Sequence, residues 1–400
     1  MEARAQQTRD TPAPEAMPRA PVGLLAVVAG ATVANLYYSQ PLLERMANSF
    51  AGGTPGLLAS LTPLGYSLGV LLFVPLGDRI ERRKLIVTLA LVTSLLLAAI
   101  ALAPTFRLLL AASFAMGVAT VIPQIVVPYA AELSPPAQRG RAIGTVASGL
   151  LFGVLLSRVI AGAVAERFGW RSVYWGAAVL TASLALLLRA VLPQRKPATA
   201  LSWWRLQGSL WTLVREEPLL RLHAFLGAMT FAAFNAFWAT LAGHLERLPA
   251  RYGPSVAGSF GLVGLVGAAA ALLVGRYSDK RGGRAVNAVA IGVLLASFVV
   301  LLAFGHSLAG IAVAVVLLDV GAQANHVSNQ TRIVALREEA RSRLNTVYMS
   351  AYVGGGSLGA LCGSLAFHAA GFWAVCAVGI GFSCIALAAL TLARRGAPWI

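Results

Sequence analysis

Two ionisable side chains lie deep inside long apolar stretches of this 400-residue chain. Asp319 follows Leu317 and Leu318, and Arg158 lies in the middle of another apolar run. A charge near the centre of a bilayer costs at least about 2.5–3.5 kcal/mol on insertion scales, so such a residue is a functional candidate. Asp319 could take up and release a proton, and Arg158 could bind an anionic group. The alternative is structural: a static pair between them, or an Asp319 satisfied by helix hydroxyls and amides.

The run that holds Asp319 continues with an unusual density of polar residues. Asp319, Gln323 and His326 follow one another at i, i+4 and i+7 spacing, which places them on one face of a helix. A lipid-facing helix could not carry these groups, so the face is predicted to point into a cavity. The same spacing could indicate a metal site, but two ligands and an amide are too few, and we predict no metal.

Polar and aromatic residues of other apolar runs are candidates for the rest of the cavity lining. Asn35 lies deep in the first run, and an amide buried in lipid without partners is costly, so it is predicted to face protein or water. Tyr38 is also predicted to line the cavity, whereas Tyr37 is either a cavity residue or part of an interfacial aromatic belt. Aromatic residues near Asn235 either line the cavity or pack in the core. The remaining predicted lining residues are Gln124, Asn235 and Trp238.

The composition places these residues in a membrane. The chain is 58% hydrophobic and 12% charged, with mean hydropathy +0.74, whereas about 25% of residues are charged in soluble proteins. A helix needs about 20 mostly apolar residues to cross a bilayer. Twelve such runs begin near residues 22, 56, 85, 108, 142, 172, 219, 255, 285, 308, 344 and 370. The expected fold class is an all-α membrane protein with twelve transmembrane helices in two pseudo-symmetric six-helix halves.

The net charge of +17 is distributed unevenly between alternate loops. Of the 32 Lys and Arg residues, 25 fall on the side that holds both termini and six on the other. Because basic residues concentrate in cytoplasmic loops, both termini are predicted to be cytoplasmic. The charge therefore reflects topology, and we predict no nucleic-acid partner.

Breaks in the apolar pattern divide the chain into segments. We predict a disordered cytoplasmic tail at 1–21, a six-helix half at 22–192, a cytoplasmic linker at 193–218, a second half at 219–393 and a tail at 394–400. Trp and Leu residues recur at helical spacing in the linker, which predicts an amphipathic helix along the membrane surface. The run at 22–43 is expected to remain as a span rather than to be cleaved as a signal peptide. The three cysteines show no disulfide or metal spacing.

Two short basic loops lie 201 residues apart, each between two apolar runs. The first contains Asp78 and the second Asp279. Both resemble the motif Gly-x-x-x-Asp-Arg/Lys-x-Gly-Arg-Arg/Lys of the major facilitator superfamily, which recurs between spans 2 and 3 and between spans 8 and 9. The first copy departs from it at Val74 and Glu81. The residues that match the motif and its basic flanks, and that the resemblance implicates in a conformational latch, are Asp78, Arg79, Arg82, Arg83, Gly275, Asp279, Lys280 and Arg284.

The resemblance covers essentially the whole chain and implies alternating access by rocking of the halves around a central site. It also implies that Asp78 caps the N-terminus of span 11 when the cytoplasmic side is closed. The string at 35–43 and the segment at 342–349 are similar to a bacterial branch of proton-coupled drug and metabolite exporters. The chain departs from that branch at Ser113, where those exporters often carry Arg, and it lacks their Gly-Pro signature in span 5.

The sequence thus predicts a transporter and not an enzyme. No nucleotide-binding pattern occurs, so the energy source is predicted to be an ion gradient, with no cofactor. The leading prediction is a proton-coupled antiporter of the bacterial inner membrane that exports small amphipathic drugs or metabolites, with Asp319 as the coupling site. Its expected partners are the small-molecule substrate, protons and the lipid bilayer, and a monomer is expected. A proton symporter or facilitator that imports an organic anion is one alternative, and a non-transporting membrane sensor or scaffold is another.

Overall fold

The computed structural model describes residues 21–194, 202–264 and 283–393, and within these ranges the regular structure is helical, with no strand. A further helical stretch covers residues 254–264. The named helices are α1 (Val22–Ala34), α2 (Leu43–Asn48), α3 (Pro55–Phe73), α4 (Leu76–Arg79), α5 (Arg82–Leu102), α6 (Phe106–Ala119), α7 (Ile122–Glu132), α8 (Arg139–Phe168), α9 (Trp170–Val191), α10 (Trp203–Glu216), α11 (Pro218–Trp238), α12 (Leu241–Arg247), α14 (Gly283–Phe304), α15 (Leu308–Val334), α16 (Arg341–Ala370) and α17 (Phe372–Leu392), with 3-10 turns η2 (Gln40–Leu42), η3 (Pro136–Gln138) and η4 (Glu338–Ala340).

Nine helices in the described ranges are long and apolar enough to cross a membrane. The short α1, the glycine- and serine-rich α16 and the stretch 254–264 bring the described apolar segments to twelve. Each begins within three residues of its predicted start. The predicted fold class, an all-α membrane protein of twelve helices in two halves, is confirmed.

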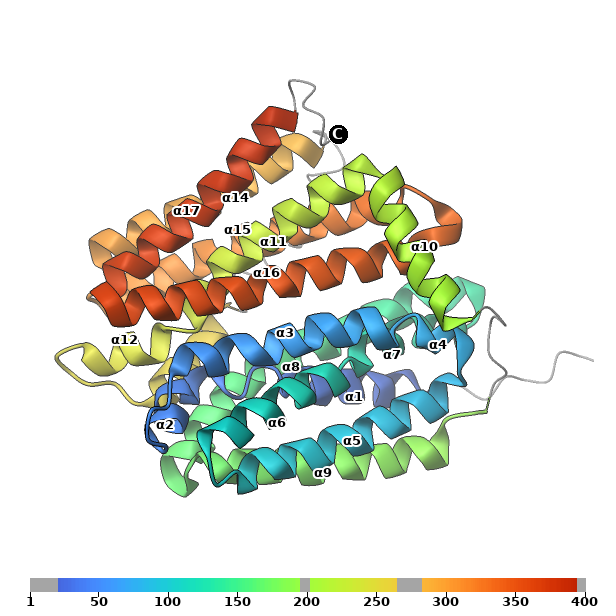
Figure 1. Cartoon of the computed structure of the whole chain (residues 1–400), viewed down its shortest axis with the longest axis horizontal. Coiled ribbons are helices and arrows are strands. Elements are labelled where there is room, and N and C mark those ends of the chain that lie inside the picture. Colours follow the sequence, from blue (N-terminus) through green and yellow to red (C-terminus); the bar gives the residue numbers. More distant parts are fainter. Residues whose placement is uncertain (1–20, 195–201, 265–282, 394–400) are drawn as a thin grey trace, which may run out of the picture.

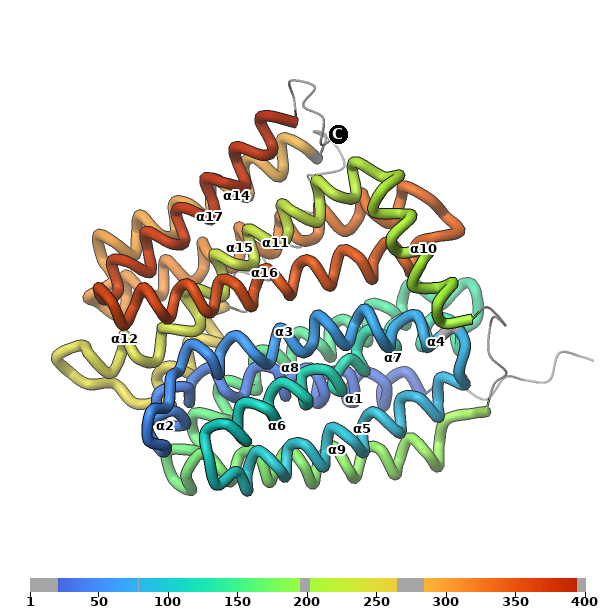
Figure 2. The backbone as a smooth tube through the Cα atoms, viewed as in Figure 1, coloured from blue at the N-terminus to red at the C-terminus, as the bar shows by residue number. Residues whose placement is uncertain are grey.

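The long helices run roughly side by side, in two groups (Figure 1). Helices α1 to α9 form one group and α11 to α17 the other, and α3 and α16 lie next to each other where the groups meet (Figures 1 and 2). Helices α4 and α10 lie at one end of the bundle, and α2 and α12 lie at the other. We call these the α4/α10 end and the α2/α12 end.

Equivalent contacts recur in the two halves. The Arg83 guanidinium in α5 donates a hydrogen bond to the carbonyl of Arg189 in α9, and Arg284 in α14 donates to the carbonyl of Leu390 in α17. Each donor lies 106 residues before its acceptor, and the two arginines are 201 residues apart, as Asp78 and Asp279 are. The repeat in the sequence is therefore also a repeat of packing, in which an arginine ties the third helix of each half to the sixth.

Close helix packing follows the same repeat. In each half, two glycines one turn apart on a long helix meet main-chain atoms of the first helix, α1 or α11, and a Cβ atom there would overlap a carbonyl oxygen. Only glycine permits this approach, which is typical of helix pairs in membranes. The pairs are Ala26 with Gly149 and Gly30 with Gly153 between α1 and α8, and Ala228 with Gly355 and Ala232 with Gly359 between α11 and α16.

Helix α10 crosses the α4/α10 end and contacts both halves. The Trp203 indole donates to the carbonyl of Leu72 at 3.2 Å, and the Gln207 amide donates to the carbonyl of Leu71 at 2.7 Å. These carbonyls lie at the C-terminal end of α3, where helix carbonyls have no partner within the helix. On the other side, Arg337 forms ion pairs with the two glutamates at the C-terminal end of α10, Glu216 and Glu217.

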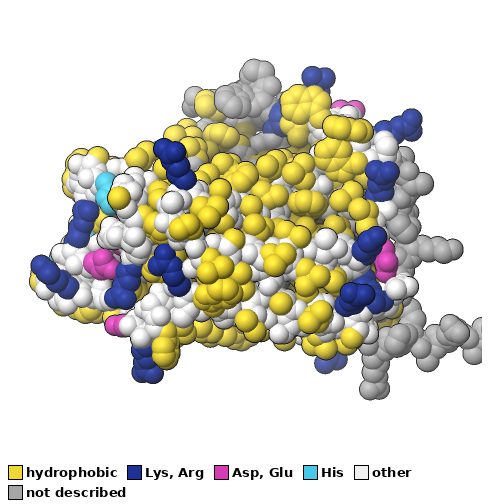
Figure 3. Space-filling model, turned by 60° about the horizontal axis from the view of Figure 1, so that its bottom comes forward, with side chains coloured by type: hydrophobic (Ala, Val, Ile, Leu, Met, Phe, Trp, Pro, Cys, Tyr) yellow, Lys and Arg dark blue, Asp and Glu magenta, His cyan; other side chains and the backbone are white. Residues whose placement is uncertain are grey.

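The outer surface of the bundle suits a bilayer. Figure 3 shows a broad belt of hydrophobic side chains, with Lys and Arg side chains gathered towards the two ends. The helix predicted in the linker is present as α10, and its Trp204 and Trp211 side chains are exposed. Tryptophan is enriched at membrane interfaces. The contact of α10 with the membrane surface stays a prediction.

We expect Gly359→Val to destabilise the bundle by about 1–3 kcal/mol or more, because the added side chain overlaps the Ala232 carbonyl and forces α16 away from α11. Gly292→Val is the matched control, since Gly292 lies in α14 with no atom within 4 Å of the added Cβ. Thermal unfolding of both purified variants in detergent measures the difference. Equal melting temperatures would contradict the packing described.

Candidate functional site

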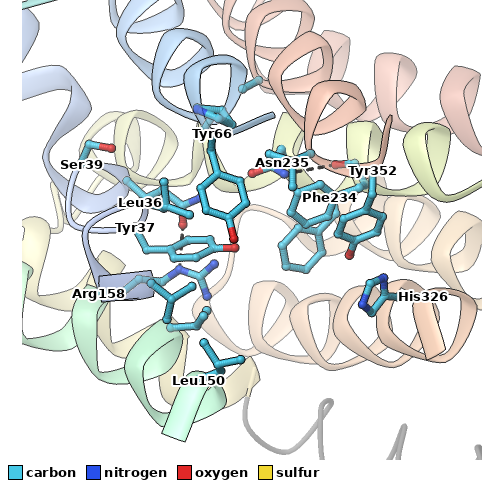
Figure 4. A pocket seen from close by; sticks show the side chains of 18 of the residues that line it. Leu36, Tyr37, Ser39, Tyr66, Leu150, Arg158, Phe234, Asn235, His326 and Tyr352 are labelled. Atoms are coloured by element: carbon cyan, nitrogen blue, oxygen red, sulfur yellow. Dashed lines mark hydrogen bonds between the residues drawn. The ribbon is translucent and has the colours of Figure 1, made fainter. Parts of the chain in front are cut away.

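A cavity of about 220 Å³ lies between the two halves. The N-terminal half lines it from α3, α7, α8 and the segment after α1, and the C-terminal half lines it from α11, α15 and α16. In Figure 4, Arg158 and Tyr37 lie on one side of the open space, and Phe234, Tyr352 and His326 lie on the other. Its polar and aromatic lining includes Tyr37, Ser39, Gln40, Tyr66, Gln124, Arg158, Phe231, Phe234, Asn235, Asp319, Gln323, His326 and Tyr352.

Two interrupted helices shape the N-terminal side of the cavity. Helix α1 ends at Ala34, and α6 and α7 are separated at Thr120 and Val121. The breaks support each other, because the Asn35 amide donates to the Thr120 hydroxyl at 3.4 Å and that hydroxyl donates to the carbonyl of Thr32 at 3.0 Å. Irregular backbone at membrane depth is tolerated where it is buried in protein or lines a cavity. The break in α1 lets Tyr37 and Gln40 face the cavity.

Arg158 is held in α8 by one hydrogen bond and by aromatic rings. Its Nε donates to Gln40 Oε1 at 2.7 Å, and its guanidinium carbon lies 3.8 Å from the centroid of the Trp238 ring and 5.1 Å from that of Tyr37. Rings at these distances attract a cation. The residue is 2% exposed, and its Nη2 atom is buried without a hydrogen-bond partner. The guanidinium is held in place, and its buried Nη2 atom makes no hydrogen bond.

Asp319 lines the same cavity from α15. It is 4% exposed, and its Oδ2 atom is buried without a hydrogen-bond partner. A Cβ atom at Gly264 would lie 3.0 Å from this oxygen, so the glycine leaves room beside the carboxylate. Among the described residues Asp319 forms no ion pair with Arg158, whose hydrogen bond goes to Gln40 instead. The static pair considered from the sequence is therefore absent.

Stacked rings form the wall contributed by α11 and α16. The Phe231 and Tyr352 rings lie 4.0 Å apart at 18°, and the Phe231 and Phe234 rings lie 5.6 Å apart at 13°. The His326 ring continues this wall 4.4 Å from Tyr352, and its Nδ1 atom is 2.9 Å from the Tyr348 hydroxyl oxygen. The cavity thus combines a flat apolar wall with two opposite charges that do not bind each other.

Comparison with known proteins identifies the family to which this arrangement belongs. Residues 23–360 match the model of the family described as the Major Facilitator Superfamily. The chain is a member of this superfamily. The uncharacterized transporter YgaY of Escherichia coli O157:H7 is 37% identical over 376 residues, with 93% of this chain and 94% of YgaY covered. SCO4007 of Streptomyces coelicolor, named as a probable transporter, is 35% identical over 364 residues, with coverages of 89% and 83%.

More distant similarities agree with the assignment. A protein of Helicobacter acinonychis named as a probable sugar efflux transporter is 25% identical over 358 residues, with 86% of this chain and 88% of that protein covered. The crystal structure of a bacterial homologue of the human lysosomal transporter Spinster, inward-facing and unoccupied, has a TM-score of 0.72 and 17% identity, with coverages of 96% and 98%. At that identity the likeness concerns the fold alone. The chain is a multi-pass membrane protein of a transporter superfamily.

The structure brings most of the predicted lining residues of this superfamily member together. The structure places Gln124, Arg158, Asn235, Asp319, Gln323 and His326 in the lining. Asn35, Tyr38 and Trp238 lie outside it: Asn35 braces the break in α1, Tyr38 packs among buried residues such as Leu42 and Met46, and Trp238 supports Arg158. The cavity is also lined by Tyr37, for which the sequence allowed either a cavity or an interfacial position, and by three residues that no sequence pattern indicated: Gln40, Tyr66 and Tyr352.

The remaining polar residues of α15 face neighbouring helices. Asn329 Oδ1 lies 2.7 Å from His223 Nδ1 in α11 and accepts a hydrogen bond from the Asn287 amide in α14 at 2.6 Å. The Asn325 amide donates to the Thr230 hydroxyl in α11 at 2.8 Å. The high polarity of this span therefore has two causes, a cavity face and a buried network within the C-terminal half.

The motif residues described at the α4/α10 end bond within their own halves. Arg82 pairs with Glu132 at 2.7 Å and donates to the carbonyl of Gly77. Arg83 and Arg284 make the repeated bonds given above, and Arg79 is exposed. Gly275, Asp279 and Lys280 lie outside the described residues, as does the side chain of Asp78. A latch at this end stays a prediction.

We expect Gln40→Leu to destabilise the protein by about 1.5–3 kcal/mol, because it removes the only hydrogen-bond acceptor that the described structure gives the buried Arg158 charge. Gln323→Leu serves as the control, since Gln323 lines the same cavity and makes no hydrogen bond in the described structure. Unfolding in detergent would be followed by tryptophan fluorescence. A loss of stability no larger than that of the control would argue against the role assigned to Gln40.

Proposed function

We propose that the chain is a proton-coupled antiporter that exports small amphipathic solutes by alternating access. The observation that carries the proposal is the pair of buried, opposite and mutually unpaired charges in the cavity between the halves. Such charges are costly in a membrane and are typical of substrate and proton pathways. A scaffold or sensor without a transport cycle would not require either of them.

The position of Asp319 suits a coupling site. It is a carboxylate in the cavity lining, it belongs to the C-terminal half, and Arg158 faces the cavity from the N-terminal half. Protonation removes its charge and with it the cost of closing the cavity around it. Deprotonation restores a charge that can hold a cationic group. Proton and substrate can therefore occupy Asp319 in turn, which links their movements in opposite directions.

Two further observations support the proposed direction of transport and placement in the membrane. The Helicobacter relative is named for efflux, which supports export by this chain. The excess of basic residues in alternate loops supports cytoplasmic termini in a bacterial inner membrane. We propose that the chain is divided as its sequence predicts, with six-helix halves at 22–192 and 219–393 joined by a linker at 193–218. We propose a monomer as the working unit.

One observation favours a second function. The unpaired Nη2 atom of Arg158 could bind the carboxylate of a substrate that enters with a proton on Asp319, which describes a symporter or facilitator importing an organic anion. Transport by inside-out vesicles separates the two functions. In an antiporter, protons leaving an acidified lumen drive substrate into the lumen, whereas in a symporter substrate leaves the lumen together with the protons.

In inside-out vesicles the lumen corresponds to the periplasmic side of the membrane. Acidifying the lumen should drive an exported solute into inside-out vesicles. A solute that instead leaves the acidified lumen together with protons would identify a symporter and overturn the proposal.

We expect Asp319→Asn to abolish proton-driven accumulation while sparing downhill exchange of substrate, because an amide cannot take up the proton that the cycle moves. Glu338→Gln is the control, since Glu338 has a highly exposed side chain outside the long helices. Accumulation and exchange are measured in liposomes that contain the purified, folded variants. Accumulation by Asp319→Asn with wild-type pH dependence would show that Asp319 is structural.

We expect Asp78→Asn to shift the protein towards the state open at the α4/α10 end. A carboxylate at a helix N-terminus contributes about 0.3–1 kcal/mol, or up to about 2 kcal/mol when partly buried, so the population of that state should rise roughly two- to thirtyfold. Labelling of a single cysteine introduced in the half of the cavity nearest that end reports the change. Unchanged labelling together with normal transport would count against a latch.

A further inference from the structure

We propose that the cavity selects a zwitterionic solute with one flat apolar ring, whose carboxylate meets Arg158 and whose amine meets Asp319. The inference rests on the proposed function and names the substrate class of the same site. It combines three features of the lining: an unsatisfied cationic donor, an unsatisfied carboxylate oxygen and a stacked aromatic wall.

The guanidinium of Arg158 offers a fixed donor to a substrate oxygen. Its Nε donates to Gln40, Trp238 and Tyr37 hold its position, and its Nη2 atom is buried without a partner. A buried charged donor without an acceptor is unfavourable. A carboxylate supplies the charge-assisted hydrogen bond that this atom lacks.

The charge of Asp319 favours binding of a zwitterionic solute over binding of a simple anion. A simple anion bound at Arg158 would share the closed cavity with the Asp319 charge, and like charges in a low dielectric repel. An amine on the same solute removes this conflict and gives Oδ2 its missing donor. The two protein charges cancel, and so do those of a zwitterion, so the loaded cavity is neutral.

The same geometry gives the exchange of proton for substrate a physical cause. The charge of the Asp319 carboxylate holds the amine, and protonation removes that charge, so the proton and the amine compete for the same group. Arg158 keeps its charge throughout and binds only the carboxylate. A solute without an amine would occupy the cavity without displacing the proton and would not be exchanged for it.

The aromatic wall and the volume of the cavity limit the shape and size of the apolar part of the solute. Phe231, Phe234 and Tyr352 present stacked faces, which favour a flat ring. The cavity of about 220 Å³ is below the roughly 300–1,000 Å³ usual for sites of drug-sized ligands. A solute with a single ring fits these dimensions better than a large multi-ring drug.

Three probes that differ only in their charged groups test the proposal: L-phenylalanine carries both groups, 2-phenylethylamine only the amine, and 3-phenylpropionate only the carboxylate. Their binding to the purified full-length wild type is measured by calorimetry in detergent at constant neutral pH, without a proton gradient. We expect L-phenylalanine to bind at least about tenfold more tightly than either other probe, because each charge-assisted hydrogen bond is worth about that factor or more.

Two variants assign the charges. In Asp319→Asn the advantage of L-phenylalanine over 3-phenylpropionate should fall below about threefold, and in Arg158→Gln its advantage over 2-phenylethylamine should fall likewise, since each variant removes one charged hydrogen bond. Because Arg158→Gln can impair folding, the comparison of the three probes on the wild type is decisive by itself.

The outcomes are separable from those of the proposed function. Equal or tighter binding of either singly charged probe, or binding of none of the three in the millimolar range, overturns the zwitterion proposal. The binding assay needs no proton coupling, so coupling can fail while selectivity stands. Proton-driven accumulation that survives Asp319→Asn overturns the antiport mechanism, whatever the probes show.

Discussion

The rest of the structure depends on one constraint, the burial of an arginine between the halves with no ion-pair partner among the described residues. Arg158 belongs to the N-terminal half, but Trp238 of the C-terminal half stacks on its guanidinium. Gly258 and Gly261 of the C-terminal half pack against its main chain and side chain. A side chain larger than hydrogen at Gly258 would collide with the Arg158 carbonyl. The halves therefore meet closely beside the charge, which borders the cavity between them.

The polar residues of α15 have two separate roles. One face of the helix lines the cavity with Asp319, Gln323 and His326, whereas Asn325 and Asn329 bond to α11 and α14. A polar network inside one half ties its helices into a unit, because separating them would leave amides unpaired in a medium without water. In the proposed cycle the C-terminal half can therefore move as a body, and its cavity-lining residues lie at its surface.

The fold could be predicted from the sequence because hydropathy and the 201-residue repeat are properties of the chain itself. The cavity face of α15 could be predicted for a similar reason, since helical spacing holds through Asp319 and His326. The choice between Tyr37 and Tyr38 could not, because α1 ends at Ala34 and the helical period is lost before either residue. Gln40 as the partner of Arg158 is 118 residues away in sequence, and no local pattern reports a contact of that kind. Trp238 was predicted to line the cavity, but its contact with the Arg158 guanidinium depends on how the halves meet.

The proposed alternating access requires that the ties between the halves be individually weak at both ends. At the α2/α12 end, the His368 and Glu44 side chains approach to only 3.8 Å, and a pair with this long separation and an exposed histidine contributes about 0–1 kcal/mol. At the α4/α10 end, α10 holds the carbonyls of α3 by two neutral hydrogen bonds, each worth about 0.5–1.5 kcal/mol. Contacts of this size can be exchanged within a cycle, whereas the glycine packing and the repeated arginine bonds within each half persist. In the proposed mechanism a single proton on Asp319 is enough to shift the balance between the two ends, since neutralising one buried charge changes the energy by an amount comparable to the stronger set of ties.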